Sequence, residues 1–270
     1  MPGKKKRTLK ERRRRKLVIV TASIGVIVLA LIVLLVMLLR LPEIRIGHVS
    51  ISGTQYSHES LVTQTVQRSL SGNYFFVVPH NNTFLYPKTE IRHELKKQFP
   101  AVRSVTFERP TMQSLSITVV ERKPDALWCA HASSSPCYLM DEDGFVFVRA
   151  PHEYPELVRY QGTLDGDIPA VFLSGAYPEL TRFIDDVGEV TKRSVDRVVR
   201  DEHGDVFVFF EEAGGELRFV HNDASDLLLQ NIASVFAAPR FHASTTPLEY
   251  ADFRFGKKVY VKFLSEDSEL

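Results

Sequence analysis

The sequence is poor in cysteine and in the short motifs that mark enzymes. It has two cysteines among 270 residues, and its nine histidines are scattered along the chain. It contains no G-x-S-x-G, S-x-x-K, H-E-x-x-H, Walker or G-x-G-x-x-G motif, and no histidine stands at a known nucleophile spacing from a Cys, Ser or acid. It also lacks internal repeats. We therefore expect a protein that binds other proteins, with no enzymatic activity, no cofactor and no metal.

Charged residues and proline are absent from one long stretch, Leu17–Leu39. As an α-helix this stretch spans roughly 34 Å, enough to cross a hydrocarbon core of about 30 Å. The preceding residues 1–16 form a basic tail with ten cations and one acid, and the positive-inside rule keeps such a terminus in the cytoplasm. A cleaved signal peptide has an apolar region of about 7–15 residues and a small-residue cleavage site, whereas this stretch ends at Arg40-Leu41-Pro42-Glu43. We expect a retained, single-pass type II transmembrane anchor.

The net charge of +1 hides an asymmetry. Beyond the basic tail the chain carries 24 Lys and Arg against 32 Asp and Glu, so the exported part is acidic. An acidic domain is a poor binder of nucleic acid, and the tail is explained by membrane topology and by attraction to anionic lipid. A nucleic-acid role for the tail stays open as an alternative.

The two cysteines, Cys129 and Cys137, both lie in the exported part, where disulfides persist. They bracket the turn-like run Ala130–Pro136 between two apolar segments, which favours a disulfide across a hairpin loop. Two free thiols are one alternative. A metal site formed by Cys129, His131 and Cys137 is the other, although it lacks paired C-x-x-C spacing and a fourth ligand.

Hydrophobic periodicity over residues 44–124 predicts a small α+β domain. Its elements are a strand over Ile44–Gly53, a helix capped by Ser57 with Leu61, Val62, Thr65, Val66 and Leu70 on one face, a helix from Pro87 to Phe99, and strands over Ala101–Arg109 and Ser114–Arg122. The order strand, helix, helix, strand, strand packs both helices on one face of a sheet.

Residues 125–264 read mostly as antiparallel strands with two helices. The predicted strands are Ala126–Ala130, Cys137–Met140, Phe145–Val148, Ser194–Asp201, Asp205–Phe210 and Glu216–Val220. Pro178 opens one helix, and Ser225 caps the other. A final hairpin joins Glu249–Phe255 to Lys258–Phe263 with Gly256-Lys257 at its tip, before an acidic tail at 265–270.

Several short motifs stand at the ends of these elements. Ser52-Gly53 closes the first strand, Phe99-Pro100-Ala101-Val102 ends the second helix, and an alternating strand runs into Glu121-Arg122-Lys123-Pro124. This run resembles the POTRA domain of the FtsQ/DivIB cell-division proteins, with Gly53, Pro100, Glu121, Arg122 and Pro124 as its fingerprint. The closing Tyr250–Val261 segment resembles the C-terminal hairpin of the same family, with Phe253 in place of the usual aliphatic residue. The resemblance thins between Ala150 and Pro178, and it does not include the cysteine pair.

The resemblance implies a non-enzymatic scaffold of the bacterial division machinery, the divisome, located in the cytoplasmic (inner) membrane at the septum. In FtsQ-like proteins the C-terminal region binds FtsB, which pairs with FtsL, and through this pair it influences the septal wall synthase; the POTRA domain adds further contacts. The partner-binding residues implied here are Tyr250, Arg254, Phe255, Gly256, Lys258, Val259, Tyr260 and Lys262.

An open sheet edge binds a partner strand through main-chain hydrogen bonds. Strand alternation divides the hairpin side chains between two faces. By this alternation the core face takes Phe253, Val261 and Phe263, and it is the alternative position for Phe255 and Val259, which share their parity. The opposite face takes Tyr250, Arg254, Tyr260 and Lys262, and it is the better interface because aromatic and arginine side chains are enriched in interfaces.

Two other function classes remain as alternatives. A POTRA-bearing chaperone or secretion component would usually show a cleaved signal, several POTRA units and a β-barrel. A type II membrane enzyme such as a glycosyltransferase would use the Asp-x-Asp of Asp141-Glu142-Asp143-Gly144, which reads better as a tight turn and lacks the further acids of a calcium loop. Glu121-Arg122 reads as a strand-end pair that closes the POTRA sheet; a catalytic acid with its cation is the alternative.

Overall fold

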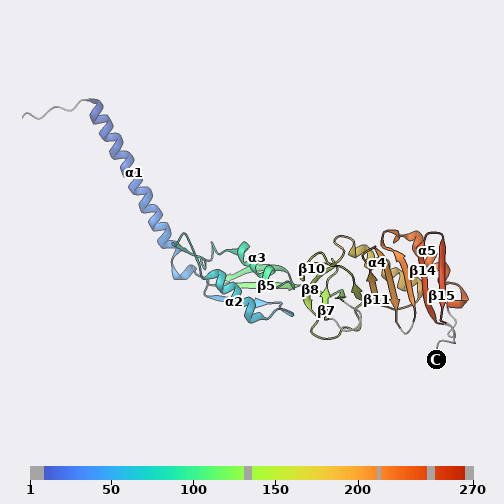
Figure 1. The fold of residues 1–270 in the computed structure, drawn as a ribbon. Helices are drawn as coiled ribbons and strands as arrows, with labels where there is room; N and C mark the ends of the chain where they lie inside the picture. Colours follow the sequence, from blue (N-terminus) through green and yellow to red (C-terminus); the bar gives the residue numbers. More distant parts are fainter. Residues whose placement is uncertain (1–8, 131–135, 212–213, 242–246, 265–270) are drawn as a thin grey trace, which may run out of the picture. The chain divides into compact units, whose positions relative to one another are not determined.

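A computed structural model of the chain describes residues 9–130, 136–211, 214–241 and 247–264, with side chains from residue 13 onward. His131 of the alternative metal site and the acidic tail at 265–270 lie outside the described residues, as do residues 1–8 of the basic tail. The chain divides into two compact units, Met1–Glu121 and Arg122–Leu270 (Figure 1). Sequence patterns placed this boundary after Pro124.

The first unit opens with helix α1, Leu9–Leu39. Its segment Arg13–Leu39 is long and apolar enough to cross a membrane: its most apolar window has a mean hydropathy of 3.2, and none of that window is buried within the protein. By length and composition α1 is therefore compatible with a single membrane span, and an N-terminal signal sequence meets the same criteria. A short 3₁₀ helix, η1 at Pro42–Ile44, follows it.

The sheet of the first unit has the order β1-β5-β4, with β1 parallel and β4 antiparallel to the central strand. The strands are β1 His48–Ser52, β4 Val102–Thr111 and β5 Ser114–Glu121. The prediction that a strand begins at Ile44 is wrong. Pro42 starts a 3₁₀ turn, and the N–H groups of Gly47 and His48 both donate to the carbonyl oxygen of Gln113, which delays regular pairing.

Two helices, α2 at Glu59–Leu70 and α3 at Lys88–Gln98, share a core with this sheet. Val62 and Val66 of α2 and Ile91 and Leu95 of α3 are fully buried against strand residues such as Ile117. The helices thus cover the sheet face that carries the apolar side chains of β5.

Two local predictions for this unit are wrong. The residue preceding α2 is His58, so Ser57 lies one position before the cap position, and no side chain caps this helix. Leu61 is exposed, since the buried stripe of α2 runs through Val62. A small hairpin, β2 Asn73–Tyr74 with β3 Val78–Pro79, was not predicted.

In its described residues the second unit forms one ten-stranded sheet in the order β10-β8-β7-β6-β9-β11-β12-β13-β14-β15 (Figure 1). The strands are β6 Ala126–Cys129, β7 Cys137–Met140, β8 Phe145–Arg149, β9 Arg159–Gln161, β10 Ala170–Val171, β11 Val195–Arg200, β12 Asp205–Phe210, β13 Glu216–Val220, β14 Leu248–Phe255 and β15 Lys258–Phe263. Most pairs are antiparallel, as predicted. The parallel pairs are β6 with β9, β9 with β11, and β13 with β14.

The helices α4 at Tyr177–Thr191 and α5 at Asp226–Phe236 pack on one face of this sheet. Pro178 stands in the first turn of α4, and Ser225 caps α5 by accepting from the N–H of Leu228 at 3.4 Å, both as predicted. Short 3₁₀ helices lie at η2 His221–Asp223 and η3 Pro239–Phe241. Strand β12 alternates regularly, with Val206, Val208 and Phe210 in the core, so Asp205, Phe207 and Phe209 occupy the opposite face of the sheet.

Candidate functional site

The C-terminal hairpin forms one margin of the ten-stranded sheet. Strand β15 is last in the strand order, and within the described part of the chain no strand pairs with its outer edge. An edge of this kind presents N–H and C=O groups that can pair with an added strand. The hairpin tip at Gly256 has a φ of +64°, a left-handed conformation that glycine adopts without steric cost.

A β-bulge changes which side chains of the hairpin share a face. Asp252 pairs with Tyr260 and Phe255 pairs with Lys258, so two residues of β14 oppose one residue of β15 in between. The extra residue moves Phe255 to the face of Tyr260, where the two rings meet edge to face with centroids 5.1 Å apart. The alternative that places Phe255 in the core is therefore wrong, and the Phe255 side chain is 56% exposed.

The other core assignments in the hairpin have mixed outcomes. Phe253 is buried, and Val259 and Phe263 pack against the main core. Val261 is exposed, contrary to the assignment, because β15 has a neighbour on one side. Tyr260 is exposed as predicted, on the same face as Phe255.

Arg254 of β14 is paired with two carboxylates, Asp205 on the nearby strand β12 and Asp252 on its own strand. Its Nη1 lies 2.5 Å from Oδ2 of Asp205, and its Nη2 lies 2.7 Å from Oδ2 of Asp252. These hydrogen bonds, that to Asp252 first, raise the pKa of Arg254. Burial acts to raise the pKa of the Asp252 carboxyl, but the hydrogen bonds from Arg254 and the charges of Arg254 and Arg218 outweigh it and lower that pKa. Arg254 is therefore held in place by the fold, and a partner would meet it in a fixed position.

Arginine and aromatic side chains continue from the hairpin across the neighbouring strands. The guanidinium of Arg218 on β13 lies 4.2 Å from the ring centroid of Tyr250 and forms an ion pair with Glu216. Arg254 lies 5.6 Å from the ring of Phe207 on β12. We call this surface the open face; its residues are Phe207, Arg218, Tyr250, Asp252, Arg254, Phe255 and Tyr260. Aromatic rings in contact with arginine guanidinium groups are typical of surfaces that bind other proteins.

Sequence reasoning missed Phe207 and Arg218 as members of this surface. Both lie in strands that were predicted correctly, but β12 is apolar at every position after Asp205, so its sequence does not show which side chains face solvent. There the core positions are Val206 and Val208, so Phe207 falls on the solvent-facing side. A large aromatic residue at a solvent-facing strand position marks a candidate contact surface.

The remaining hairpin residues lie at the rim of this surface. Lys262 Nζ lies 2.7 Å from Oε2 of Glu249, and this hydrogen bond raises the pKa of Lys262. Lys258 and Gly256 are exposed near the tip. The structure thus brings the predicted partner-binding residues onto two strands, with Val259 turned toward the core and the others turned away from it or at the tip.

Three of the predicted fingerprint residues have defined roles in the first unit. Gly53 has a φ of +86°, and a Cβ there would lie 2.1 Å from the carbonyl oxygen of Val119, so no other residue fits without movement. The Glu121 carboxylate accepts hydrogen bonds from the N–H groups of Gln55, Tyr56 and Ser57 at 2.6, 2.7 and 2.9 Å. Pro100 lies in the turn between α3 and β4. Gly53 and Glu121 thus connect the segment after β1 to β5, and Pro100 marks the turn from α3 into β4.

The expectation that Glu121 and Arg122 form a pair is wrong, because each has its own partner. Arg122 forms an ion pair with the buried carboxylate of Asp141, and its guanidinium lies 4.0 Å from the ring centroid of Phe145. Oδ1 of Asp141 accepts from the N–H groups of Asp143 and Phe145, which makes the predicted tight turn. Pro124 is half-buried in the segment that precedes β6. In the described residues no group of three or more His, Cys, Asp or Glu is arranged to hold a metal ion.

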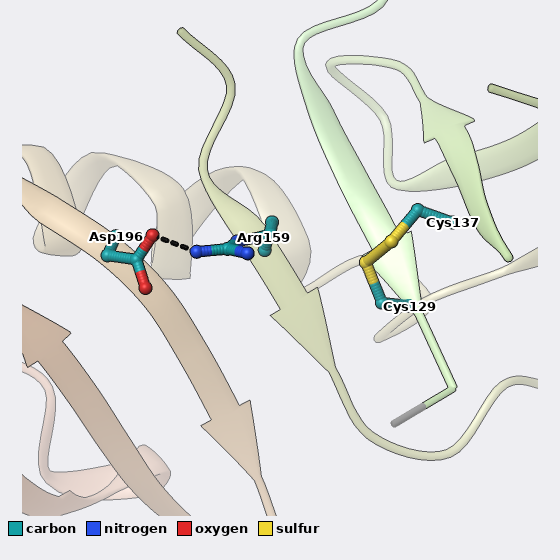
Figure 2. The surroundings of a disulfide bond; sticks show 4 residues. All are labelled: Cys129, Cys137, Arg159 and Asp196. Atoms are coloured by element: carbon teal, nitrogen blue, oxygen red, sulfur yellow. Dashed lines mark hydrogen bonds and ion pairs between the residues drawn. A yellow bond between two sulfur atoms is a disulfide. The ribbon is translucent and has the colours of Figure 1, made fainter. Parts of the chain in front are cut away.

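Cys129 of β6 and Cys137 of β7 stand opposite each other in register and form a disulfide with a Cα–Cα distance of 4.3 Å (Figure 2). Because the sulfur atoms are bonded to each other, the alternative metal site has no thiolate ligands, and the free-thiol alternative is also wrong. Figure 2 also shows the neighbouring ion pair between Arg159 of β9 and Asp196 of β11. These groups border a groove of about 910 Å³ that sequence reasoning missed, since β9 was not predicted.

No protein-family model matches the chain, and no curated protein matches it either. The resemblance to a family therefore depends on the motifs themselves and on the positions they occupy in the fold.

Proposed function

We propose that this protein is a non-enzymatic scaffold of the bacterial divisome, of the FtsQ/DivIB type. In this proposal α1 is a retained anchor with its N-terminus in the cytoplasm, and both units lie on the outer side of the cytoplasmic (inner) membrane at the septum. Residues 44–124 are a POTRA domain, and residues 125–264 are the partner-binding β domain. The observation that carries the proposal is the open edge of β15 beside the arginine and aromatic residues of the open face.

The first unit supports the POTRA assignment through its topology and its motif residues. A three-stranded mixed sheet has both helices in one core, in the sequence order expected for this domain. Gly53 and Glu121 stand where the fold requires a glycine and a carboxylate, which accounts for these residue types in the motif. The helix α1 is long and apolar enough to serve as the anchor.

The proposed mechanism is assembly by strand addition. A strand of an FtsB-type partner pairs with the outer edge of β15, and main-chain hydrogen bonds supply most of the affinity. Phe255 and Tyr260 supply side-chain specificity on the open face. Because all partners are confined to one membrane, their effective concentration is high and individually weak contacts suffice. FtsB/FtsL-type proteins and the septal wall synthase are thereby gathered at one place.

The experiment is a pull-down with the full chain, solubilised in mild detergent, from the membrane extract of the source cells. It compares wild type with Tyr260→Pro, which removes one backbone N–H of β15, and with the matched variant Tyr260→Ala, which keeps that N–H and removes the ring. Val261→Pro is included because alternate N–H groups of an edge strand point outward, so one of the two proline variants removes an outward donor.

We expect a small coiled-coil membrane partner to be captured by wild type and lost with one proline variant that retains its circular dichroism spectrum. Retention of the partner by Tyr260→Ala then separates main-chain pairing from ring contacts. If both folded proline variants retain the partner, strand addition at β15 is wrong. Capture of outer-membrane barrels in place of division proteins would favour the secretion alternative.

A further inference from the structure

Two adjacent phenylalanines in the first unit lie almost entirely in solvent. Phe75 and Phe76 are 92% and 94% exposed, in the turn between β2 and β3. Both have positive φ angles, +47° and +62°, which side chains with a Cβ rarely adopt. The turn is closed by a hydrogen bond from the N–H of Val77 to the carbonyl oxygen of Tyr74 at 2.9 Å. The backbone thus holds both rings outward, away from any core of its own unit.

This turn is bonded to the residue that follows α1. Nε of Arg40 donates to the carbonyl oxygen of Val77 at 2.6 Å, and its Nη2 donates to that of Phe76 at 3.4 Å. Arg40 comes directly after Leu39, the last residue of α1. The two exposed rings are therefore held at the C-terminal end of the one described helix that is long and apolar enough to cross a membrane.

A second connection comes from the segment after β3. The side chain of Asn82 is fully buried, and its Nδ2 donates to the carbonyl oxygen of Leu39 at 2.8 Å. Three further exposed apolar side chains accompany this connection: Leu41, Phe84 and Leu85. Arginines stand among them, with Arg109 5.8 Å from the ring of Phe84 and Arg45 bonded to the carbonyl oxygen of Arg40 at 2.6 Å. Apolar rings flanked by cations suit the boundary between phospholipid headgroups and acyl chains.

We propose that the Phe75-Phe76 turn is a second membrane contact, in which both rings insert into the phospholipid surface where α1 ends. Aromatic side chains favour this interfacial region, and the rings lie beside the residue at which α1 reaches it. The contact fixes the first unit at the bilayer, so the unit does not swing freely about the end of α1. The proposal depends on α1 spanning the bilayer and is independent of the division role.

The test uses the full chain reconstituted in phospholipid nanodiscs, with Phe75→Trp and Phe76→Trp as fluorescent reporters. Trp128 of the second unit is the natural tryptophan of the chain and is buried, so wild type supplies the background signal. The matched control is Val120→Trp. Val120 is 47% exposed on the same unit, and it lies about 20 Å along β5 from Ser114, which pairs with His48 near the end of α1.

Lipids brominated on their acyl chains are then substituted for ordinary phospholipid. We expect a blue-shifted emission from the tryptophan at residue 75 and from that at residue 76, with at least about twofold stronger quenching at each than at residue 120. Equal quenching at all three positions would overturn the proposal. A blue shift without lipid quenching would also overturn it, because the rings would then be covered by a second copy or another protein.

A double variant, Phe75→Ser with Phe76→Ser, tests whether the rings serve the fold. Because both side chains are exposed, we expect the thermal unfolding midpoint of the full chain in detergent to be unchanged. A large fall in that midpoint would show that the rings pack on the protein, and the membrane contact would be rejected.

Discussion

Asn82 bonds the loop after β3 directly to the end of α1, through the hydrogen bond from its Nδ2 to the carbonyl oxygen of Leu39. The carbonyl groups in the last turn of a helix have no partner within the helix, so a side-chain donor here satisfies one of them. Oδ1 of the same amide accepts from the N–H of Phe84 at 2.9 Å. Within the first unit, one buried side chain therefore connects the end of α1 to the loop after β3.

The first prediction follows from this connection. Replacing Asn82 by Ala leaves the N–H of Phe84 and the carbonyl oxygen of Leu39 without this partner, and we expect the free energy of unfolding to fall by about 1–3 kcal/mol. The measurement is chemical denaturation of the full chain in detergent. Asn81→Ala is the matched control, because the Asn81 side chain makes a longer bond, 3.5 Å, to the carbonyl oxygen of Ile46. Equal losses in the two variants would contradict the assigned role.

In this protein, long and regular helices and strands could be predicted from the sequence, whereas short ones could not. Strands β12 and β13 were predicted with their observed bounds because β12 is a run of valine and phenylalanine, β13 alternates at Leu217, Arg218 and Phe219, and turn residues lie between them. The helix α5 was predicted from its apolar stripe and its Ser225 cap. By contrast, β9 and β10 have three and two residues, too few to show a period, and they exist because longer neighbours pair with them.

The candidate surfaces were less predictable because they depend on departures from regularity. The bulge in β14 moves Phe255 to the other face, and no alternation pattern reveals an inserted residue. The left-handed turn at Phe75 and Phe76 could not be predicted from the sequence either, since phenylalanine does not favour a positive φ. Glu121 was read as part of a charged pair, whereas its partners are backbone N–H groups more than sixty positions away in the sequence.

A second prediction concerns the Glu121 carboxylate. Glu121→Ala leaves the N–H groups of Gln55, Tyr56 and Ser57 without their acceptor, and we expect a loss of about 2–3 kcal/mol in the free energy of unfolding. Glu121→Gln keeps one acceptor oxygen, so its free energy of unfolding should fall by less than that of Glu121→Ala. Glu108→Ala, at an exposed position on β4, is the control and should change stability little. If Glu108→Ala and Glu121→Ala shift the midpoint of urea denaturation equally, the stabilising role assigned to the Glu121 carboxylate is wrong.

A third prediction concerns pH and the network around Arg254. The folded-state pKa of Asp252 lies below its ordinary value of 3.8, so the ionised carboxylate favours the folded state. Its stabilising contribution is fully present above about pH 4 and is lost as the pH falls through the lowered folded-state pKa. We expect Asp252→Asn to reduce the free energy of unfolding at pH 7 and to differ less from wild type near pH 3. Denaturant unfolding at both pH values measures this difference.

The control for this prediction is Glu249→Gln, which removes the exposed ion pair with Lys262. Exposed pairs contribute little to stability, so its unfolding midpoint should follow that of wild type at both pH values. A penalty for Asp252→Asn that does not change between the two pH values would show that it does not come from loss of the carboxylate charge and that the lowered pKa has no consequence for stability.

The last prediction concerns the disulfide between Cys129 and Cys137, whose residues are separated by 8 positions. Closing so short a loop limits the entropy that the cross-link removes from the unfolded chain, and the loop-entropy relation gives about 2.5 kcal/mol. We expect Cys129→Ala combined with Cys137→Ala to lower the free energy of unfolding of the second unit by this amount. Both cysteines lie in the second unit, so the rate of amide hydrogen exchange in the core strands of the first unit should not change. If exchange in β4 and β5 accelerates as much as in β6 and β7, the two units do not unfold separately and the bridge stabilises the whole chain.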